Sequence, residues 1–220
     1  MVSAWFNKWD EAYKQASFFR SDKNSKEYWD TVADSGSSGL DGLGHIEILE
    51  EYLIRNNYID ENTTLLDAGC GLGDYTVRFA KICKSVTAMD YSANMLKQCE
   101  DRCLKEGLNN VFNLQEDIRN SSPDKSYDSV LACLNPSTYS PLVFDRLLKT
   151  ARKFVVYFSM DNSIGDDAEP VYKGSNSVKY PSYYLEELGM NYKKISYTYF
   201  IRKADGSKVS IPFAYLIVDI

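Results

Sequence analysis

The chain has 220 residues, of which 44% are hydrophobic, and it carries a formal net charge of −6 at pH 7. That length allows one α/β domain with a substantial core and a small addition, and the sequence has no apolar run near the roughly 20 residues that a membrane helix needs. The acidic balance disfavours a nucleic acid as partner, because affinity for a polyanion comes mainly from lysine and arginine.

The cysteines are odd in number and include no C-x-x-C pair; they are Cys70, Cys83, Cys99, Cys103 and Cys133. This pattern is typical of reduced thiols. The N-terminal residues also lack the layout of a secretory signal, so we expect a cytoplasmic protein. Cys99 and Cys103 are four residues apart, but no second ligand pair matches them, and we expect no metal site.

The first part of the chain is predicted to be a helical arm. Residues 1–34 are rich in tryptophan, tyrosine and phenylalanine, and glycine and serine dominate 35–44. Such a glycine–serine stretch is typical of a flexible link. We therefore expect an N-terminal arm with its hinge at 1–43 and a single domain at 44–220. An arm on a hinge is suited to closing over a site.

Helices and strands alternate from residue 44 onward. Helices are predicted at 44–56, 74–84 and 93–106, the last with Ser92 as N-cap and Gly107 as its stop. Between and after them we expect strands at 64–67, 86–90, 111–114, 129–134 and 154–158. Two final strands, 195–201 and 209–218, are predicted to form an antiparallel hairpin. The expected fold class is therefore α/β, a Rossmann-like doubly wound sheet of seven mostly parallel strands.

A glycine-rich turn follows the first predicted strand, in the segment Leu65-Leu66-Asp67-Ala68-Gly69-Cys70-Gly71-Leu72-Gly73. An open parallel sheet binds ligands beyond the carboxyl ends of its strands, and three successive strand ends carry carboxylates here. Asp67 precedes the turn, Asp90 ends the second strand and Asp117 follows the third. We expect Asp90 to accept hydrogen bonds from ribose hydroxyls and Asp117 to meet an adenine amino group.

The position of Asp67 indicates the kind of ligand. It stands two residues before the first glycine of Gly69-x-Gly71-x-Gly73, and a carboxylate there would repel the pyrophosphate of a dinucleotide. It suits a ligand with an ammonium or sulfonium group instead. That points to S-adenosylmethionine (SAM), which has both cations and no phosphate.

These segments together resemble the class I SAM-dependent methyltransferases. Residues 66–73 resemble the first motif of that family, and 86–92 with Met95-Leu96 resemble its second motif region. Glu116-Asp117-Ile118 is similar to the adenine-contacting segment, and 127–132 to the fourth strand. The resemblance covers about residues 44–160 and implies SAM as cofactor, with S-adenosylhomocysteine (SAH) as product.

The resemblance also implies which residues bind the cofactor. It assigns Asp67, Gly69 and Gly71 to the methionine end, Asp90 to the ribose, Tyr91 or Met95 to the adenine face, Asp117 and Ile118 to the adenine edge, and Cys133 and Leu134 to the sulfonium region. Tyr28-Trp29, ahead of the domain, resembles the helical arm that closes over the cofactor in small-molecule methyltransferases. Asp74 and Tyr75 either contact cofactor or substrate, or cap a helix.

The catalytic group is the least determined part of the prediction. Asn135-Pro136-Ser137-Thr138-Tyr139 partly resembles the Asn-Pro-Pro-Tyr signature of amino-group methyltransferases, from which it departs at the second proline and in the spacing to Tyr139. Asn135 and Tyr139 are therefore weak candidates, since Asn-Pro also starts loops. His45, the only histidine, is a conceivable base or a helix-end residue in solvent.

The predicted function is transfer of a methyl group from SAM to a small-molecule acceptor at oxygen, nitrogen or sulfur. Two other functions stay open: a regulatory protein that binds SAM or a nucleotide without turnover, and an NAD-dependent oxidoreductase, which shares the βαβ unit. The sequence indicates neither the acceptor nor the oligomeric state.

Overall fold

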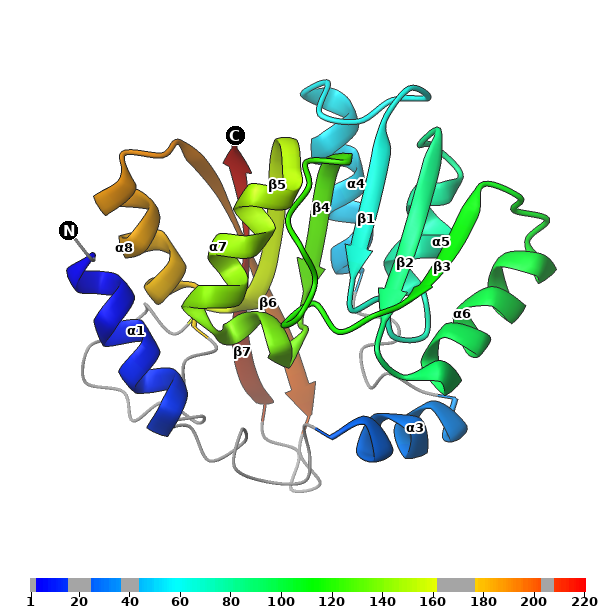
Figure 1. Ribbon diagram of the computed structural model, residues 1–220, viewed down its shortest axis with the longest axis horizontal. Helices are drawn as coiled ribbons and strands as arrows, with labels where there is room; N and C mark the ends of the chain where they lie inside the picture. Colours follow the sequence, from blue (N-terminus) through cyan, green and yellow to red (C-terminus); the bar gives the residue numbers. More distant parts are fainter. Residues whose placement is uncertain (1–2, 16–24, 37–43, 162–176, 203–207) are drawn as a thin grey trace.

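The computed structural model describes residues 3–15, 25–36, 44–161, 177–202 and 208–220. Its centre is a seven-stranded sheet with the strand order β3-β2-β1-β4-β5-β7-β6 (Figure 1). The first five strands are parallel, and β7 pairs antiparallel with both β5 and β6. The predicted doubly wound sheet with an antiparallel C-terminal hairpin is confirmed.

The strand bounds differ from the predicted ones by up to three residues, and most of the observed strands are longer. They are β1 Thr64–Ala68, β2 Ser85–Asp90, β3 Val111–Gln115, β4 Tyr127–Cys133, β5 Ala151–Met160, β6 Tyr192–Arg202 and β7 Lys208–Asp219. The described helices are α1 Ala4–Gln15, α3 Lys26–Asp34, α4 His45–Arg55, α5 Asp74–Ala80, α6 Ala93–Lys105, α7 Pro141–Thr150 and α8 Lys179–Leu188. A 3₁₀ turn, Pro136–Tyr139, precedes α7.

Helix ends follow the expected capping chemistry. The hydroxyl of Ser92 accepts a hydrogen bond from the Met95 backbone N–H at 3.1 Å, which caps α6. Gly107 has a φ of +69°, the left-handed conformation that ends a helix. Helix α5 ends at Ala80, four residues earlier than predicted.

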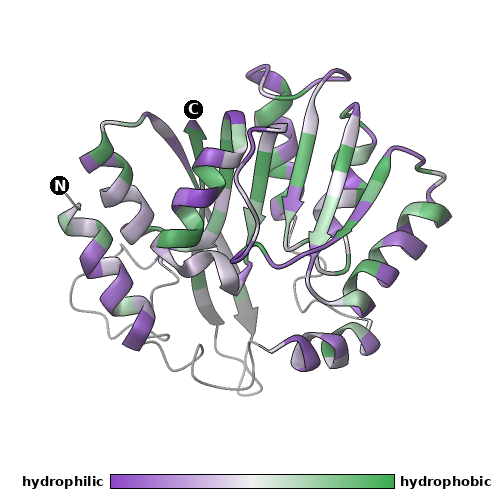
Figure 2. Ribbon diagram, in the orientation of Figure 1, coloured by the Kyte–Doolittle hydropathy of each residue, from purple (hydrophilic) through white to green (hydrophobic). Residues whose placement is uncertain are grey.

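The sheet is covered on both faces by two hydrophobic layers. On one face Leu66, Val130 and Val155 pack with α1, α7 and α8; on the other Leu65 and Leu131 pack with α4 and α5. Successive strand residues point to opposite faces, so a strand buried on both sides needs a continuous apolar run. Figure 2 shows this, with hydrophobic residues along the central strands and hydrophilic ones on the outer sides of the helices.

The two described helices of the predicted arm pack on different parts of the domain. Trp9 of α1 is fully buried, and its ring lies 5.3 Å from that of Phe144 in α7. Helix α3 lies against α6, where Ser92 donates a hydrogen bond to Asp30 at 2.5 Å. Most of the predicted link, 37–43, lies outside the described residues. Within the described ranges, no helix is long and apolar enough to cross a membrane.

Candidate functional site

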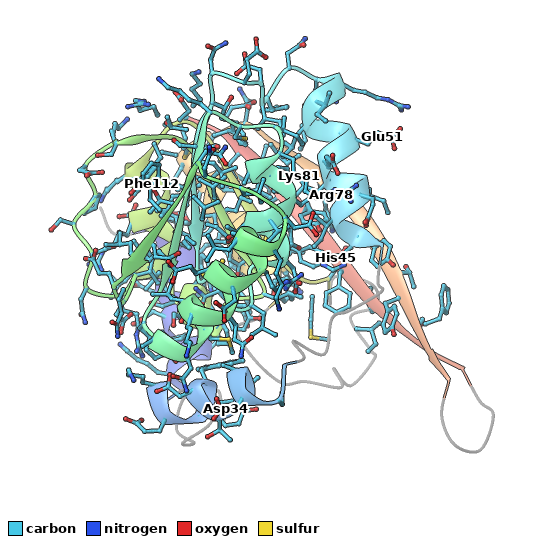
Figure 3. All side chains as sticks on the ribbon, turned by 90° about the vertical axis from the view of Figure 1, so that its right-hand side faces the viewer. Asp34, His45, Glu51, Arg78, Lys81 and Phe112 are labelled. Atoms are coloured by element: carbon cyan, nitrogen blue, oxygen red, sulfur yellow. The ribbon has the colours of Figure 1, made fainter. Side chains whose placement is uncertain are left out.

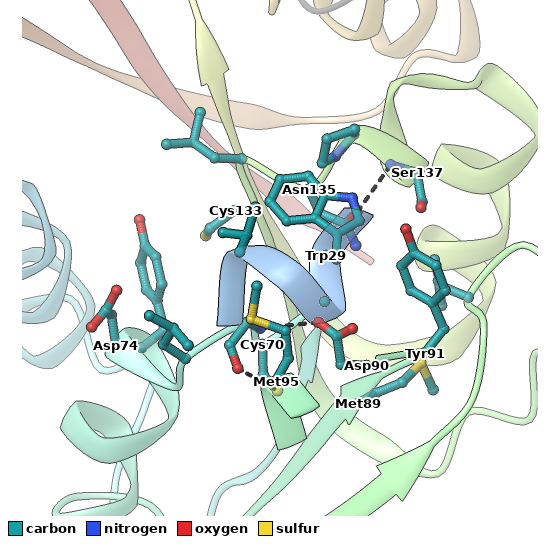
Figure 4. A pocket seen from close by; sticks show the side chains of 18 of the residues that line it. Trp29, Cys70, Asp74, Met89, Asp90, Tyr91, Met95, Cys133, Asn135 and Ser137 are labelled. Carbon is teal, nitrogen blue, oxygen red and sulfur yellow. Dashed lines mark hydrogen bonds between the residues drawn. The ribbon is translucent and has the colours of Figure 1, made fainter. Parts of the chain in front are cut away.

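A pocket of about 900 Å³, part of it open to solvent, lies at the carboxyl ends of β1, β2 and β4. Figure 4 shows Asp74 and Tyr91 at opposite ends of the pocket, with Cys70 and Asp90 between them. The pocket brings together many of the residues predicted to bind the cofactor: Gly69, Gly71, Asp90, Tyr91, Met95, Ile118, Cys133 and Leu134.

The glycine turn is fixed to the end of β2. The backbone N–H groups of Gly69 and Cys70 both donate to the carbonyl oxygen of Met89, at 2.8 and 2.9 Å. A Cβ at Gly69 would lie 2.0 Å from the Asn135 amide nitrogen, whereas a Cβ at Gly71 would meet no atom within 4 Å. Gly71 is therefore the glycine of the turn that leaves its space open to a ligand.

Asp90 lies at the centre of the pocket and is nearly buried, with 7% of its surface exposed. One carboxylate oxygen accepts the Gly71 N–H at 3.1 Å, and the other accepts the Ser92 N–H at 2.9 Å. Burial raises the pKa of Asp90 above its ordinary value, and these amide donors oppose part of that rise. A carboxylate has about four lone-pair sites, so Asp90 can also accept a hydrogen bond from a hydroxyl.

Asp67 lies beneath the turn and is not among the pocket-lining residues. It is 2% exposed and accepts a hydrogen bond from the Thr76 hydroxyl at 2.6 Å. Burial raises the pKa of Asp67 to about 7; the Thr76 hydrogen bond opposes the rise, and the charges of Asp90 and Asp74 add to it. The carboxyl is thus poised to change its charge near neutral pH.

At the other end of the pocket, Tyr91, Met95 and Ile118 form an apolar lining, and Glu116 is the acidic residue beside them. Asp117 is not in the lining; its carboxylate is held by the Arg119 guanidinium at 2.7 and 2.9 Å. Burial works to raise the pKa of Asp117, but Arg119 outweighs it and the pKa is lowered. Sequence reasoning missed Glu116, which stands one residue before the position that the motif indicates.

The segment after β4 forms a further wall of the pocket and packs against the glycine turn. Leu134 has a φ of +50°, a conformation that costs a non-glycine residue roughly 1 kcal/mol or more, and its N–H donates to Phe158. The Asn135 side chain donates to the Ala68 carbonyl and accepts the Ser137 N–H, both at 2.9 Å. Its amide therefore ties this loop to the end of β1. Tyr139 is buried below the loop and does not line the pocket.

Helix α3 forms one wall of the pocket through Trp29 and Val32. Tyr28 contacts the Trp29 ring edge-on at 5.1 Å but does not line the pocket. His45 also lies outside the lining, at the start of α4, and is buried rather than solvated. The first two residues of α5, Asp74 and Tyr75, both line the pocket. Among the described residues, no group of His, Cys, Asp or Glu is arranged to hold a metal ion.

The known proteins to which this chain is similar are methyltransferases. Residues 65–156 match the family model of a methyltransferase domain. The methyltransferase phqN of Penicillium fellutanum is 25% identical over 133 residues, covering 56% of this chain and 40% of that protein. The 23S rRNA (uracil(1939)-C(5))-methyltransferase RlmD of Shewanella sediminis is 28% identical over 139 residues, covering 60% and 29%. The chain spans less than half the length of these relatives.

A solved SAM-dependent methyltransferase from Aquifex aeolicus has the same fold, with a TM-score of 0.56 and 19% identity over 86% of this chain and 98% of that one. The matched family segment runs from β1 into β5 and contains the glycine turn, Asp90 and most of the pocket lining. The segment 65–156 is therefore a methyltransferase domain of the class I SAM-dependent kind, whose cofactor is SAM.

Proposed function

We propose that the protein transfers a methyl group from SAM to a small-molecule acceptor at oxygen, nitrogen or sulfur. The observation that carries the cofactor assignment is the alignment of three features along one pocket: an apolar end at Tyr91 and Ile118, Asp90 at the centre, and the open space at Gly71. This order fits the adenine, ribose and methionine parts of SAM. Trp29 of α3 would cover the bound cofactor and exclude water from the reaction.

The protein's part in such a reaction is mainly positioning. The sulfonium already activates the methyl carbon, so in-line displacement needs the acceptor held against it in a dry site. Cys133, Leu134 and Tyr75 would surround that point, since all three line the pocket. Asp67, whose pKa of about 7 leaves it partly ionised near neutral pH, would favour the cationic methionine end from beneath the turn in its charged form.

Two observations favour a small acceptor over a nucleic acid. The net charge of −6 gives no general attraction to a polyanion. The Asn135 amide already uses one N–H and one oxygen lone pair within the fold, which leaves it fewer groups with which to hold an amino group of a base. The unpaired thiols fit a reducing cytoplasm, because all five cysteines are free.

The test is transfer from methyl-labelled SAM, offered in parallel to a small-metabolite extract and to total RNA. We expect label in the small-molecule fraction and stoichiometric formation of SAH. Label in the RNA would contradict the acceptor class. SAH binding without transfer to either pool would support the non-catalytic alternative instead.

A further inference from the structure

Ser92 links helix α3 to the carboxylate at the centre of the cofactor pocket. Its hydroxyl donates to one carboxylate oxygen of Asp30 at 2.5 Å, and its backbone N–H donates to Asp90 at 2.9 Å. The same hydroxyl accepts the Met95 N–H at 3.1 Å, the bond that caps α6. Ser92 is fully buried, where a hydroxyl left without a partner is costly.

The bond from Ser92 to Asp30 is a charge-assisted one. A hydroxyl that donates to an ionised carboxylate forms a shorter and stronger hydrogen bond than it forms with a neutral acceptor. The second carboxylate oxygen of Asp30 is held by Lys26 at 2.7 Å, one turn earlier in α3. Lys26 and Ser92 hold the pKa of Asp30 below its ordinary value, so the acceptor is charged at neutral pH.

The apolar side of α3 rests on the elements that form the cofactor pocket. Ala33 is fully buried with Leu72 and Met95, and Trp29 and Val32 pack against this group. Leu72 belongs to the glycine turn and Met95 to the first turn of α6, and both line the pocket. Figure 4 shows α3 crossing the pocket, with Trp29 among the labelled lining residues. Helix α3 is thus docked directly on the cofactor-binding elements.

The outer side of α3 makes weaker contacts with α6. Asp34 is exposed, and Figure 3 shows it at the edge of the molecule, on α3 below α6. Its carboxylate is 3.4 Å from the Asn94 side-chain amide, which also lies 3.4 Å from the Asp30 carbonyl oxygen. These distances are long for hydrogen bonds. In the described part of the chain, the bond from Ser92 to Asp30 is therefore the strongest polar link between the two helices.

We propose that Asp30 is a positioning residue that couples the docking of α3 to the binding of the cofactor ribose. This proposal depends on the placement of SAM along the pocket described above. Asp30 holds α3 on Ser92, and the Ser92 N–H holds the Asp90 carboxylate that would face the ribose. Docking also places Trp29 over the pocket. A cofactor that binds better to the docked state shifts α3 toward it, so each event stabilises the other.

A double-mutant cycle in the full chain tests this coupling. We expect Asp30→Ala to weaken SAH binding by about 5- to 30-fold, as Trp29→Ala does, because an undocked α3 no longer places the indole over the ligand. In the Asp30→Ala background, Trp29→Ala should then weaken binding by less than about twofold more. Losses that multiply in the double variant would show that Asp30 does not hold Trp29 in place, and they would overturn the proposal.

Two further variants separate the hydrogen bond from a general effect of charge. Asp34→Ala is the matched control, since it removes the same charge from the exposed side of α3, and its Kd for SAH should stay within about twofold of wild type. Asp30→Asn keeps an oxygen that can accept the Ser92 hydroxyl, and its affinity should lie between those of wild type and Asp30→Ala. It replaces Asp30→Ala in the cycle if that variant does not fold. An equal loss in Asp34→Ala would overturn the role of the Asp30 bond.

Hydrogen exchange of the α3 amides, residues 26–34, measures docking without any need for turnover. We expect SAH to slow this exchange in wild type by about fivefold or more, and Asp30→Ala to speed it before SAH is added. Exchange that Asp30→Ala leaves unchanged, or that bound SAH does not slow, would contradict the coupling while leaving SAH binding intact. Failure of the wild type to bind SAH would instead contradict the placement of the cofactor itself.

Discussion

The side chain of Asn135 occupies the space that a side chain at Gly69 would need. A Cβ there would lie 2.0 Å from the amide nitrogen and 2.6 Å from the amide carbon, and Gly69 has a φ of +82°. The same amide donates to the Ala68 carbonyl at 2.9 Å. The first glycine of the turn is thus required by packing between β1 and the loop after β4, whereas Gly71 faces the ligand space.

Replacing Gly69 therefore tests packing as well as backbone strain. We expect Gly69→Ala to lower the free energy of unfolding by more than the roughly 1–2 kcal/mol of left-handed strain alone. Gly189→Ala measures that strain by itself, because Gly189 has a φ of +67° and nothing within 4 Å. In an Asn135→Ala background the cost of Gly69→Ala should fall toward that of Gly189→Ala. The free energy of unfolding is measured with denaturant. If Gly69→Ala lowers it equally in both backgrounds, the contact with the Asn135 side chain does not contribute to the loss.

Asp90 is expected to hold the ribose. Asp90→Ala should weaken SAH binding by about 1.5–3 kcal/mol, roughly 10- to 150-fold, through loss of two hydrogen bonds to a charged acceptor. Asp101→Ala, on the exposed side of α6, controls for the change in net charge. A dissociation constant unchanged from wild type in calorimetric titration would rule out this role.

Trp29 and Tyr28 are adjacent in α3 but differ in position, since only Trp29 lines the pocket. We expect Trp29→Ala to weaken SAH binding by about 1–2 kcal/mol, roughly 5- to 30-fold, because an indole that covers the ligand is removed. Stopped-flow measurement should place most of the loss in faster dissociation. Tyr28→Ala serves as the matched control. An equal loss of SAH affinity in Tyr28→Ala would mean that α3 affects binding only through its packing on the domain.

Asp67 should make the stability of the ligand-free protein depend on pH. Its pKa is about 7 in the folded protein, above the ordinary value of 3.8, so folding favours the protonated form. The resulting stability is fully present below pH 3.8 and is lost as the pH rises through 7, with an upper limit on the order of 4 kcal/mol. Asp67→Asn should flatten this dependence in urea unfolding between pH 4 and 8. A decline of the same size in the variant would assign it to another group.

Much of the sheet could be predicted from the sequence, because strands buried on both faces are continuous apolar runs ended by turn residues. The segment 65–68, apolar except for Asp67, is an example of such a strand. The Ser92 cap is a local signal of another kind, because it marks where α6 begins. Helices α7 and α8 were not predicted, although Pro141 stands at the first position of α7, where proline favours a helix start. These helices are stabilised by tertiary packing, α7 on β5 and α1 and α8 on α1, and their local sequence pattern alone does not indicate a helix.

The candidate site was predictable where backbone position alone determines it, as at Gly71 and Asp90. Side-chain orientation was not: Asp117 lies against Arg119 while Glu116 faces the pocket. His45 was predicted either as a base or as a solvated helix end, and its burial against Phe158 depends on the distant hairpin. Contacts between residues more than a hundred positions apart leave no local pattern to detect.

Isothermal titration of the purified wild-type protein with SAH measures directly whether the pocket binds the cofactor product. We expect one site per chain, with saturation reached at micromolar ligand and affinity reduced by Asp90→Ala. No heat of binding up to high micromolar SAH, together with thermal stabilisation by NADH instead, would contradict this expectation.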